Sequence, residues 1–72
     1  MKNRVKKYRE LAGLTQEELS EKSYVSRNTI SSLETGSNTN VTYDTMIKIA
    51  EALNETVATI FFEEKAQNIV QK

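Results

Sequence analysis

The chain has 72 residues, of which 38% are hydrophobic and 28% are charged, a composition typical of one small globular domain. A chain of this length buries only about 60% of the surface that its unfolded form exposes, so it has room for a single hydrophobic core. It contains no cysteine and no histidine, which excludes disulfides, Cys/His zinc sites and catalysis by either side chain. We therefore expect a protein that is not an enzyme and has no cofactor, no metal and no small-molecule ligand.

Ten Lys and Arg residues balance ten Asp and Glu residues, and zero net charge at first argues against a polyanionic partner. The charge is nevertheless unevenly distributed along the chain. The nine N-terminal residues carry five basic side chains and no acidic one, so the remainder carries five basic and ten acidic groups. No apolar stretch approaches the length of a membrane span or a signal-peptide core, which with the absence of cysteine predicts a soluble cytoplasmic protein with no membrane partner.

The chain lacks proline, and its two glycines separate segments with helical periodicity, which predicts an all-α protein. Val5, Tyr8 and Ala12, with Leu11 alongside, predict a first helix over about residues 2–12 that ends at Gly13 in the left-handed conformation.

Local capping patterns predict the next two helices. Thr15 and Glu18 form a capping box, with Leu14 and Leu19 as a hydrophobic staple, so a second helix is expected over about residues 16–22. After a break at residues 23–25, Ser26 caps a third helix that runs to about Glu34 and is ended by Gly36.

The remaining helices follow a polar loop at residues 37–40. Thr42 caps a fourth helix with Asn54 as its left-handed terminator, and Thr56 caps a fifth that begins at Val57 and places Phe61 in the core. The periodicity weakens after Glu63, so residues 63–72 either extend the last helix or lack order. The sequence therefore predicts one domain over residues 1–72, built as a compact five-helix bundle.

Residues 15–34 contain two short capped helices separated by three residues, which is the spacing of a helix-turn-helix. Apolar residues on both helices would pack them together, leaving one face of the third helix outward. The side chains expected on this outward face are Arg27, Asn28, Ser31 and Ser32. Arginine can bond guanine O6 and N7 and asparagine can bond adenine N6 and N7, each worth about 1–3 kcal/mol of discrimination, so these four residues are predicted to contact bases.

Segments RELAGLTQEEL (residues 9–19), VSRNTISSLETG (25–36) and IKIAEAL (47–53) carry a resemblance that extends over residues 4–62. They resemble the lambda-repressor-like, Cro/CI-type (xenobiotic response element) helix-turn-helix family. The resemblance implies a lambda-repressor-like five-helix fold and a regulator, in most cases a repressor, that binds a palindromic double-stranded DNA operator as a homodimer. The size of the chain and its Phe61-Phe62 ending are also similar to those of restriction-modification controller proteins.

The resemblance also implies roles for individual residues. Arg27, Asn28 and Ser32 would read base edges, and Arg9 would pair with Glu34 to tie the first helix to the third. Phosphate contacts are expected from the start of the second helix, the cap of the third, the loop after it and the basic N-terminal run, namely Gln16, Ser26, Ser37, Asn38, Lys2 and Arg4.

Three positions depart from the family pattern. Tyr24 stands where glycine is usual, so it must either adopt the left-handed region, at about 1–2 kcal/mol, or change the turn. Ser23 replaces a usually apolar residue, which is expected to weaken local packing. The loop after Gly36 is neutral where the family is often basic, so affinity is expected to depend more on the N-terminal lysines.

A palindromic site requires two recognition helices about 34 Å apart, and hence a dimer. We expect the dimer surface to include Phe62, Ile69 and Val70 with the corner at residues 54–56, including Glu55. The acidic residues Glu17, Glu18 and Glu21 make RNA polymerase a further candidate partner, although first-turn carboxylates also stabilise a helix dipole.

The alternative function is a protein-interaction module of the same fold, an antitoxin-like or regulatory docking domain in which DNA binding is secondary. Zero net charge favours it. The salt dependence of binding to random duplex separates the two functions, since a DNA reader loses affinity steeply as salt rises.

Overall fold

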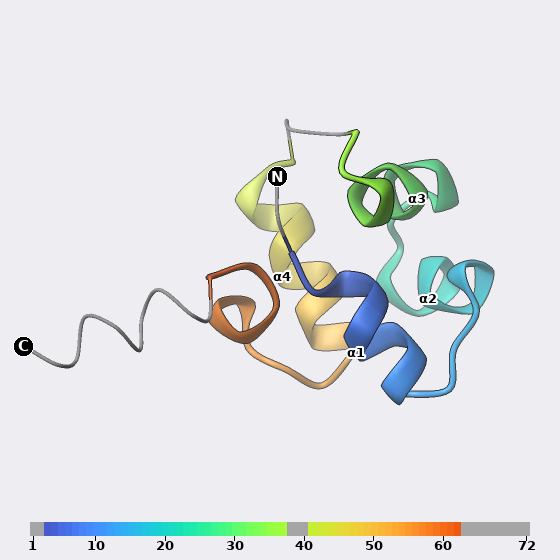
Figure 1. The fold of residues 1–72 in the computed structure, drawn as a ribbon, viewed down its shortest axis with the longest axis horizontal. Helices are drawn as coiled ribbons and strands as arrows, with labels where there is room; N and C mark the ends of the chain where they lie inside the picture. Colours follow the sequence, from blue (N-terminus) through green and yellow to red (C-terminus); the bar gives the residue numbers. More distant parts are fainter. Residues whose placement is uncertain (1–2, 38–40, 63–72) are drawn as a thin grey trace, which may run out of the picture.

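The computed structural model of the chain describes residues 3–37 and 41–62. These residues form four α-helices and a final π-helical segment (Figure 1), namely α1 (Val5–Leu11), α2 (Gln16–Ser23), α3 (Arg27–Thr35), α4 (Tyr43–Ala52) and η1 (Ala58–Phe62). No strand occurs in this part of the chain, and the all-α, five-helix prediction is confirmed. Lys2, Asn38, Ile69, Val70 and the question of order in residues 63–72 lie outside the described residues.

Helix α1 begins at Val5 and ends at Leu11, so it is shorter than the predicted span of residues 2–12. The Asn3 carboxamide oxygen accepts a hydrogen bond from the Val5 N–H at 3.0 Å, satisfying a donor that the helix leaves unpaired. Gly13 ends the helix as predicted, with φ of 76° and its N–H bonded to the Glu10 carbonyl at 3.0 Å. Leu11, which the periodicity placed alongside the apolar face, is instead 71% exposed.

The caps of the next three helices are confirmed. Thr15 Oγ1 accepts from the Glu18 N–H at 3.0 Å while the Glu18 carboxylate accepts from the Thr15 N–H at 2.9 Å, which completes the capping box. Ser26 and Thr42 cap α3 and α4 through their hydroxyl oxygens. The terminators Gly36 and Asn54 both have positive φ. Short-range side-chain hydrogen bonds therefore fix where these helices begin, and left-handed residues follow the ends of α3 and α4.

The fifth element differs from the expected α-helix, because Ala58–Phe62 winds as a π-helix. Thr56 caps it as predicted, accepting from the Thr59 N–H at 3.0 Å. A π-helix has a wider turn than an α-helix, so consecutive side chains are separated by a smaller rotation. Ile60 and Phe61 can therefore both enter the core, where they are 1% and 7% exposed, while Phe62 stays 47% exposed.

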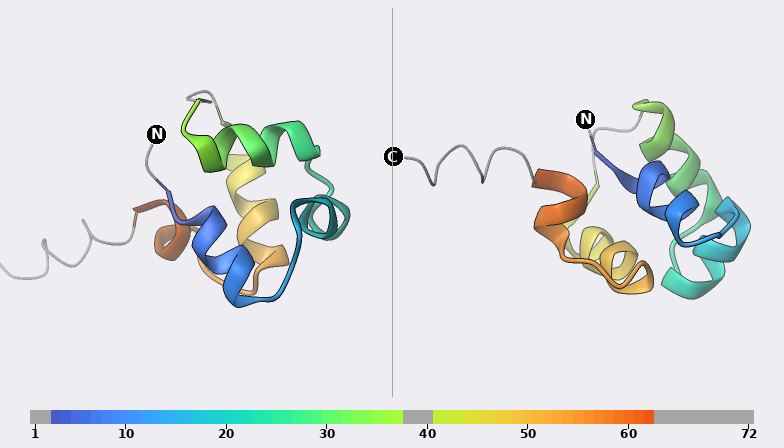
Figure 2. Two further views of the ribbon diagram at one scale, coloured as in Figure 1. Left: turned by 45° about the vertical axis from the view of Figure 1, so that its right-hand side comes forward. Right: turned by 60° about the horizontal axis from the view of Figure 1, so that its bottom comes forward.

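The hydrophobic core draws residues from every element. Its buried members are Val5, Leu19, Val25, Ile30, Leu33, Met46, Ile49, Ala50, Leu53, Ile60 and Phe61. Helix α2 packs against α3 and α4, and α1 packs against α3 and η1. Helix α3 lies along one edge of the molecule in both views of Figure 2. The packing thus leaves one side of α3 open to solvent.

The residues just before α1 link three elements. The Asn3 amide nitrogen donates to the Leu33 carbonyl near the end of α3 at 3.1 Å, and the Arg4 N–H donates to the Ile60 carbonyl in η1 at 2.8 Å. The segment therefore ties α3 and η1 to the start of α1. None of the described helices is long and apolar enough to cross a membrane.

Candidate nucleic-acid interface

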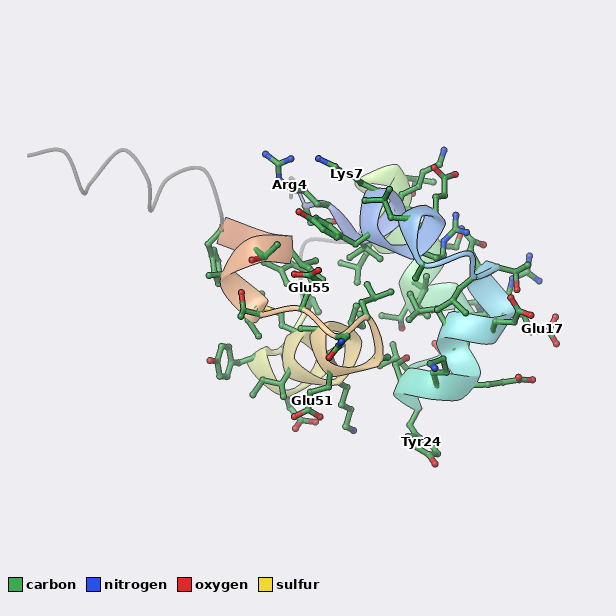
Figure 3. All side chains as sticks on the ribbon, turned by 90° about the horizontal axis from the view of Figure 1, so that it is seen from below. Arg4, Lys7, Glu17, Tyr24, Glu51 and Glu55 are labelled. Carbon is green, nitrogen blue, oxygen red and sulfur yellow. The ribbon has the colours of Figure 1, made fainter. Side chains whose placement is uncertain are left out.

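The turn between α2 and α3 is made by Tyr24 in the left-handed conformation, with φ of 61° and ψ of 28°. Of the two alternatives expected for this position, tyrosine adopts the conformation that glycine would take, at a cost of about 1–2 kcal/mol. Its side chain is 87% exposed and projects away from the ribbon (Figure 3). The helix-turn-helix geometry is therefore kept without a glycine.

The side chains of two serines stabilise this turn by hydrogen bonds to the backbone. Ser23 is 2% exposed, and its hydroxyl donates to the Leu19 carbonyl at 2.7 Å and accepts from the Val25 N–H at 3.3 Å. Ser20 donates to the Val25 carbonyl at 2.7 Å. Because the Ser23 hydroxyl donates one hydrogen bond and accepts another, the polar group at this usually apolar position avoids the cost of an unsatisfied buried donor. The weakening expected from sequence is thereby offset by hydrogen bonds that hold the turn.

Helix α3 is oriented by its buried side, where Ile30 and Leu33 are 0% and 1% exposed. Residues on the opposite side of a helix must then face outward. Arg27 and Asn28 are exposed in the first turn, whereas Ser31 and Ser32, one turn later, are half-buried. The Ser26 hydroxyl accepts from the Thr29 N–H at 3.2 Å and so fixes the N-terminal end of this face.

An ion pair connects α1 to the last turn of α3. Arg9 Nε donates to Glu34 Oε2 at 2.7 Å and Arg9 Nη2 to Glu34 Oε1 at 3.1 Å, and only 11% and 4% of these two side chains are exposed. A third guanidinium nitrogen, Nη1, donates to the Leu14 carbonyl at 2.7 Å. This is the pair expected from sequence. Through Leu14 it holds the residues just before α2, and through Glu34 it holds the last turn of α3.

Gln16, the first residue of α2, joins the same cluster. Its Nε2 donates to Glu34 Oε1 at 2.9 Å, across 18 residues of sequence. The sequence assigned Gln16 only an outward contact and missed this internal bond, for which no local pattern gives a signal. The bond uses one of the two N–H groups of the carboxamide, so one donor and the oxygen are left for another partner.

Charge and hydrogen bonding keep the Arg9–Glu34 pair ionised. Burial acts to raise the pKa of Glu34, but hydrogen bonds from Arg9 and Gln16 and the positive charges of Arg9 and Lys6 outweigh it and hold that pKa below its usual value. The hydrogen bond to Glu34 raises the pKa of Arg9 against the opposing effect of burial. The ionised pair therefore holds α1, the start of α2 and the last turn of α3 together.

The other predicted site residues are spread over two regions. Arg4 is half-buried beside η1, with its side chain at the surface near Lys7 in Figure 3, and Ser37 is exposed just after α3. Glu55 and Phe62 are exposed in the corner before η1 and at its end, and η1 lies on the side of the molecule away from α2 (Figure 1). Among the described residues, no cluster of acidic side chains could hold a metal ion.

Comparisons with known proteins agree with this architecture. A helix-turn-helix family model matches residues 5–60, which is more than half of the chain. One similar solved structure is the complex of SinR protein with SinI protein. It has 32% sequence identity and a TM-score of 0.79, and the match covers 90% of this chain and 62% of that one. No curated protein matches the chain significantly.

The family match spans α1 to α4 and reaches Ile60, so it includes the two capped helices, the Tyr24 turn and most of the core. The SinR–SinI structure shares this arrangement of helices, and the chain spans less than two thirds of that neighbour's length. The chain therefore belongs to the Cro/CI-type helix-turn-helix family of DNA-binding transcriptional regulators.

Proposed function

We propose that this protein is a repressor that binds a palindromic operator as a homodimer, with α3 of each protomer in the major groove. The observation that carries the proposal is the exposure of Arg27 and Asn28 in the first turn of a helix that Ile30 and Leu33 hold from behind. Recognition helices of this motif contact base edges with their N-terminal residues. The chemistry involved is recognition alone.

Base readout is assigned to the outward side chains of α3. Arg27 suits guanine, whose O6 and N7 accept its two parallel N–H groups, and Asn28 suits adenine, whose N7 accepts and N6 donates. The two side chains are adjacent on a capped helix end, so they would read neighbouring base pairs. Ser31 and Ser32 would contact bases one helical turn further along.

Phosphate contacts would flank this readout. Gln16 keeps one carboxamide N–H beyond its bond to Glu34, and it stands at the positive end of the α2 dipole. Ser26 and Ser37 are exposed at the two ends of α3, and each would donate its hydroxyl to a phosphate oxygen in place of the threonine hydroxyl that it contacts in the free protein, Thr29 or Thr35. The charged contacts would come from the N-terminal run, where Arg4 and Lys2 are the candidates, and Asn38 completes the set in the loop.

The dimer surface would lie at the other end of the protomer. Phe62 is 47% exposed although its neighbour Phe61 is buried, and Glu55 is exposed in the preceding corner. An aromatic side chain left half in water at the end of a core is suited to burial against a second copy. Ile69 and Val70 are proposed to extend this surface.

Selecting bound sequences from a random duplex pool tests the whole proposal. We expect an inverted repeat whose half-site centres are about 10 base pairs, or a multiple of that, apart. A single, unrepeated half-site would contradict the homodimer, and a pool without enrichment would contradict sequence-specific DNA binding.

A protein partner is the second candidate function, and the SinR–SinI complex is the observation that favours it, since the similar protein is there bound to another protein. Random-duplex mobility shifts at increasing salt separate the candidates, because phosphate contacts release counterions and give a steep decline in affinity. If DNA binding is secondary, no shift will occur at protein concentrations that saturate a partner.

A contact with RNA polymerase is a more specific proposal for a protein partner. Glu17 and Glu21 are exposed on α2, whereas the Glu18 carboxylate is already used in the capping box. Transcription assays with Glu17→Gln and Glu21→Gln variants would show reduced activation at unchanged operator affinity if the contact exists.

A further inference from the structure

The outermost stripe of α3 consists of Asn28, Ser32 and Thr35, spaced at i, i+4 and i+7 opposite the buried Ile30 and Leu33. Both hydroxyls in this stripe donate to carbonyls of their own helix. Ser32 Oγ donates to the Asn28 carbonyl at 2.9 Å, and Thr35 Oγ1 donates to the Ser32 carbonyl at 3.2 Å. Since a hydroxyl has one hydrogen, each oxygen can act toward any further partner only as an acceptor.

Ser32 is the better placed of the two acceptors. Thr35 Oγ1 lies 3.1 Å from Ser37 Oγ, and because the Thr35 hydrogen is directed to the Ser32 carbonyl, Ser37 is the donor of that bond. One lone pair of Thr35 is thus occupied. Within the described residues, no donor bonds Ser32 Oγ, so both of its lone pairs are available.

The neighbouring Ser31 provides an internal contrast. Its hydroxyl has no hydrogen bond with another described residue, and it is half-buried like that of Ser32. It can therefore rotate to donate or to accept, according to what it meets. Ser32 can therefore only accept from a further partner, because its hydrogen is directed to the Asn28 carbonyl, whereas the adjacent Ser31 can either donate or accept.

In the major groove, adenine and cytosine present an exocyclic amine, whereas guanine and thymine present a keto oxygen. Every base pair has one of each, on opposite strands. We propose that Ser32 reads this orientation at one base pair, accepting from adenine or cytosine on the strand it faces and disfavouring guanine or thymine there. The inference rests on the proposed function and specifies part of the operator.

The position of that base pair follows from helix geometry. Ser32 lies four residues beyond Asn28, which is about 6 Å along the helix. Successive bases on one strand are about 3.4 Å apart, so Ser32 would read one or two base pairs beyond the pair read by Asn28. A keto oxygen at that position would require the hydroxyl to turn away from the Asn28 carbonyl and lose that bond. From the net worth of one neutral hydrogen bond, we expect a preference of roughly three- to tenfold.

The experiment uses an operator obtained by random selection, with all four base pairs tested in turn at each position of one half-site. Dissociation constants are measured for the unaltered protein, for Ser32→Ala and for the matched control Ser31→Ala. We expect one position where adenine and cytosine bind roughly three- to tenfold tighter than guanine and thymine. The preference should vanish in Ser32→Ala and persist in Ser31→Ala.

A second measurement removes the amine without adding a keto oxygen. Purine replaces adenine, or a cytosine analogue lacking its exocyclic amino group replaces cytosine, at that position. The unaltered protein should lose the same factor, and Ser32→Ala should lose nothing. Equal thermal unfolding midpoints for the two serine variants would confirm that both remain folded.

The possible results distinguish the assignment of Ser32 from the proposed function on which it rests. Retention of the amine preference by Ser32→Ala, or a preference for guanine and thymine at the responding position, overturns the assignment of Ser32 while leaving DNA binding intact. A pool in which no duplex is enriched overturns the proposed function itself.

Discussion

Arg9 and Glu34 join α1 to the last turn of α3 through two hydrogen bonds, of 2.7 and 3.1 Å, between side chains almost removed from water. Glu34 also receives the Gln16 amide. A buried pair of this kind adds little net stability compared with apolar residues, but it is costly to break because one charge is left without a partner. The relationship makes Arg9 and Glu34 structural, with effects on DNA binding that pass through α2 and α3.

Replacing Glu34 with alanine should lower the free energy of unfolding by about 3–5 kcal/mol, since it strands the Arg9 guanidinium in the interior. Urea unfolding followed by circular dichroism measures this. Glu10→Ala is the matched control, because that carboxylate is 4.0 Å from Arg9 but 58% exposed, and its loss should cost less than about 1 kcal/mol. Similar losses in the two variants would contradict a buried role for Glu34.

The same carboxylate should make stability depend on acidity. The pKa of Glu34 in the folded protein lies below its usual value of 4.5, so the folded state binds this proton less readily than the unfolded state. Its contribution is complete above the unfolded pKa and is lost as the pH falls through the folded pKa. We expect Glu34→Gln to reduce the decline in the unfolding free energy between about pH 5 and pH 3. Parallel pH profiles for the two proteins would argue against the assignment.

Replacing Tyr24 with glycine should stabilise the protein by about 1 kcal/mol, because glycine takes the left-handed conformation without the Cβ penalty at a modest entropic cost. Little packing is lost, since the tyrosine side chain is 87% exposed. The same change at Asn54, which also has positive φ, should gain less because asparagine tolerates this region. Thermal unfolding ranks the three proteins, and a destabilised Tyr24→Gly would mean that the ring packs more than its exposure indicates.

Arg27→Ala should weaken binding to the selected operator at least tenfold, which corresponds to the loss of one bidentate base contact. Binding to random duplex should change little. Fluorescence anisotropy with both duplexes measures the ratio, and Lys22→Ala, which removes an exposed basic side chain from the last turn of α2, is the charge control. Equal losses on the two duplexes would make Arg27 a phosphate contact.

Phe62→Glu should raise the dissociation constant of the homodimer by tenfold or more, because it places a charge in a surface proposed to be apolar. Sedimentation at tens of micromolar protein gives the distribution of monomer and dimer. A monomeric profile for the unaltered protein at that concentration would remove the basis for the dimer.

The sequence predicted those features that depend on neighbours along the chain. The caps at Thr15, Ser26 and Thr42 join residues three apart, and the left-handed terminators follow from the residue types themselves. It left the Tyr24 turn as two alternatives, because the choice depends on whether Ser20 and Ser23 can fasten the chain on either side.

Long-range contacts account for what the sequence did not predict. The bond between Gln16 and Glu34 spans 18 residues, and the π-helical η1 places Ile60 and Phe61 in a core whose other members come from distant parts of the chain. Leu11 satisfied the periodicity but lies at the last residue of α1, where no neighbouring element covers it. A residue at the end of a helix can fit the apolar periodicity of that helix and still be exposed to solvent.

The two hydrogen bonds made by Asn3 and Arg4 have a consequence for the operator. Because they hold the Leu33 and Ile60 carbonyls on one short segment, helix α3, which is proposed to read DNA, and the surface proposed for pairing are held at a set separation within each protomer. Adding one base pair between the half-sites shifts them by about 3.4 Å and about a tenth of a turn. In the proposed homodimer, a protomer held in this way has little freedom to adjust to that shift, so Asn3 and Arg4 would help to set the spacing of half-sites that it can bind.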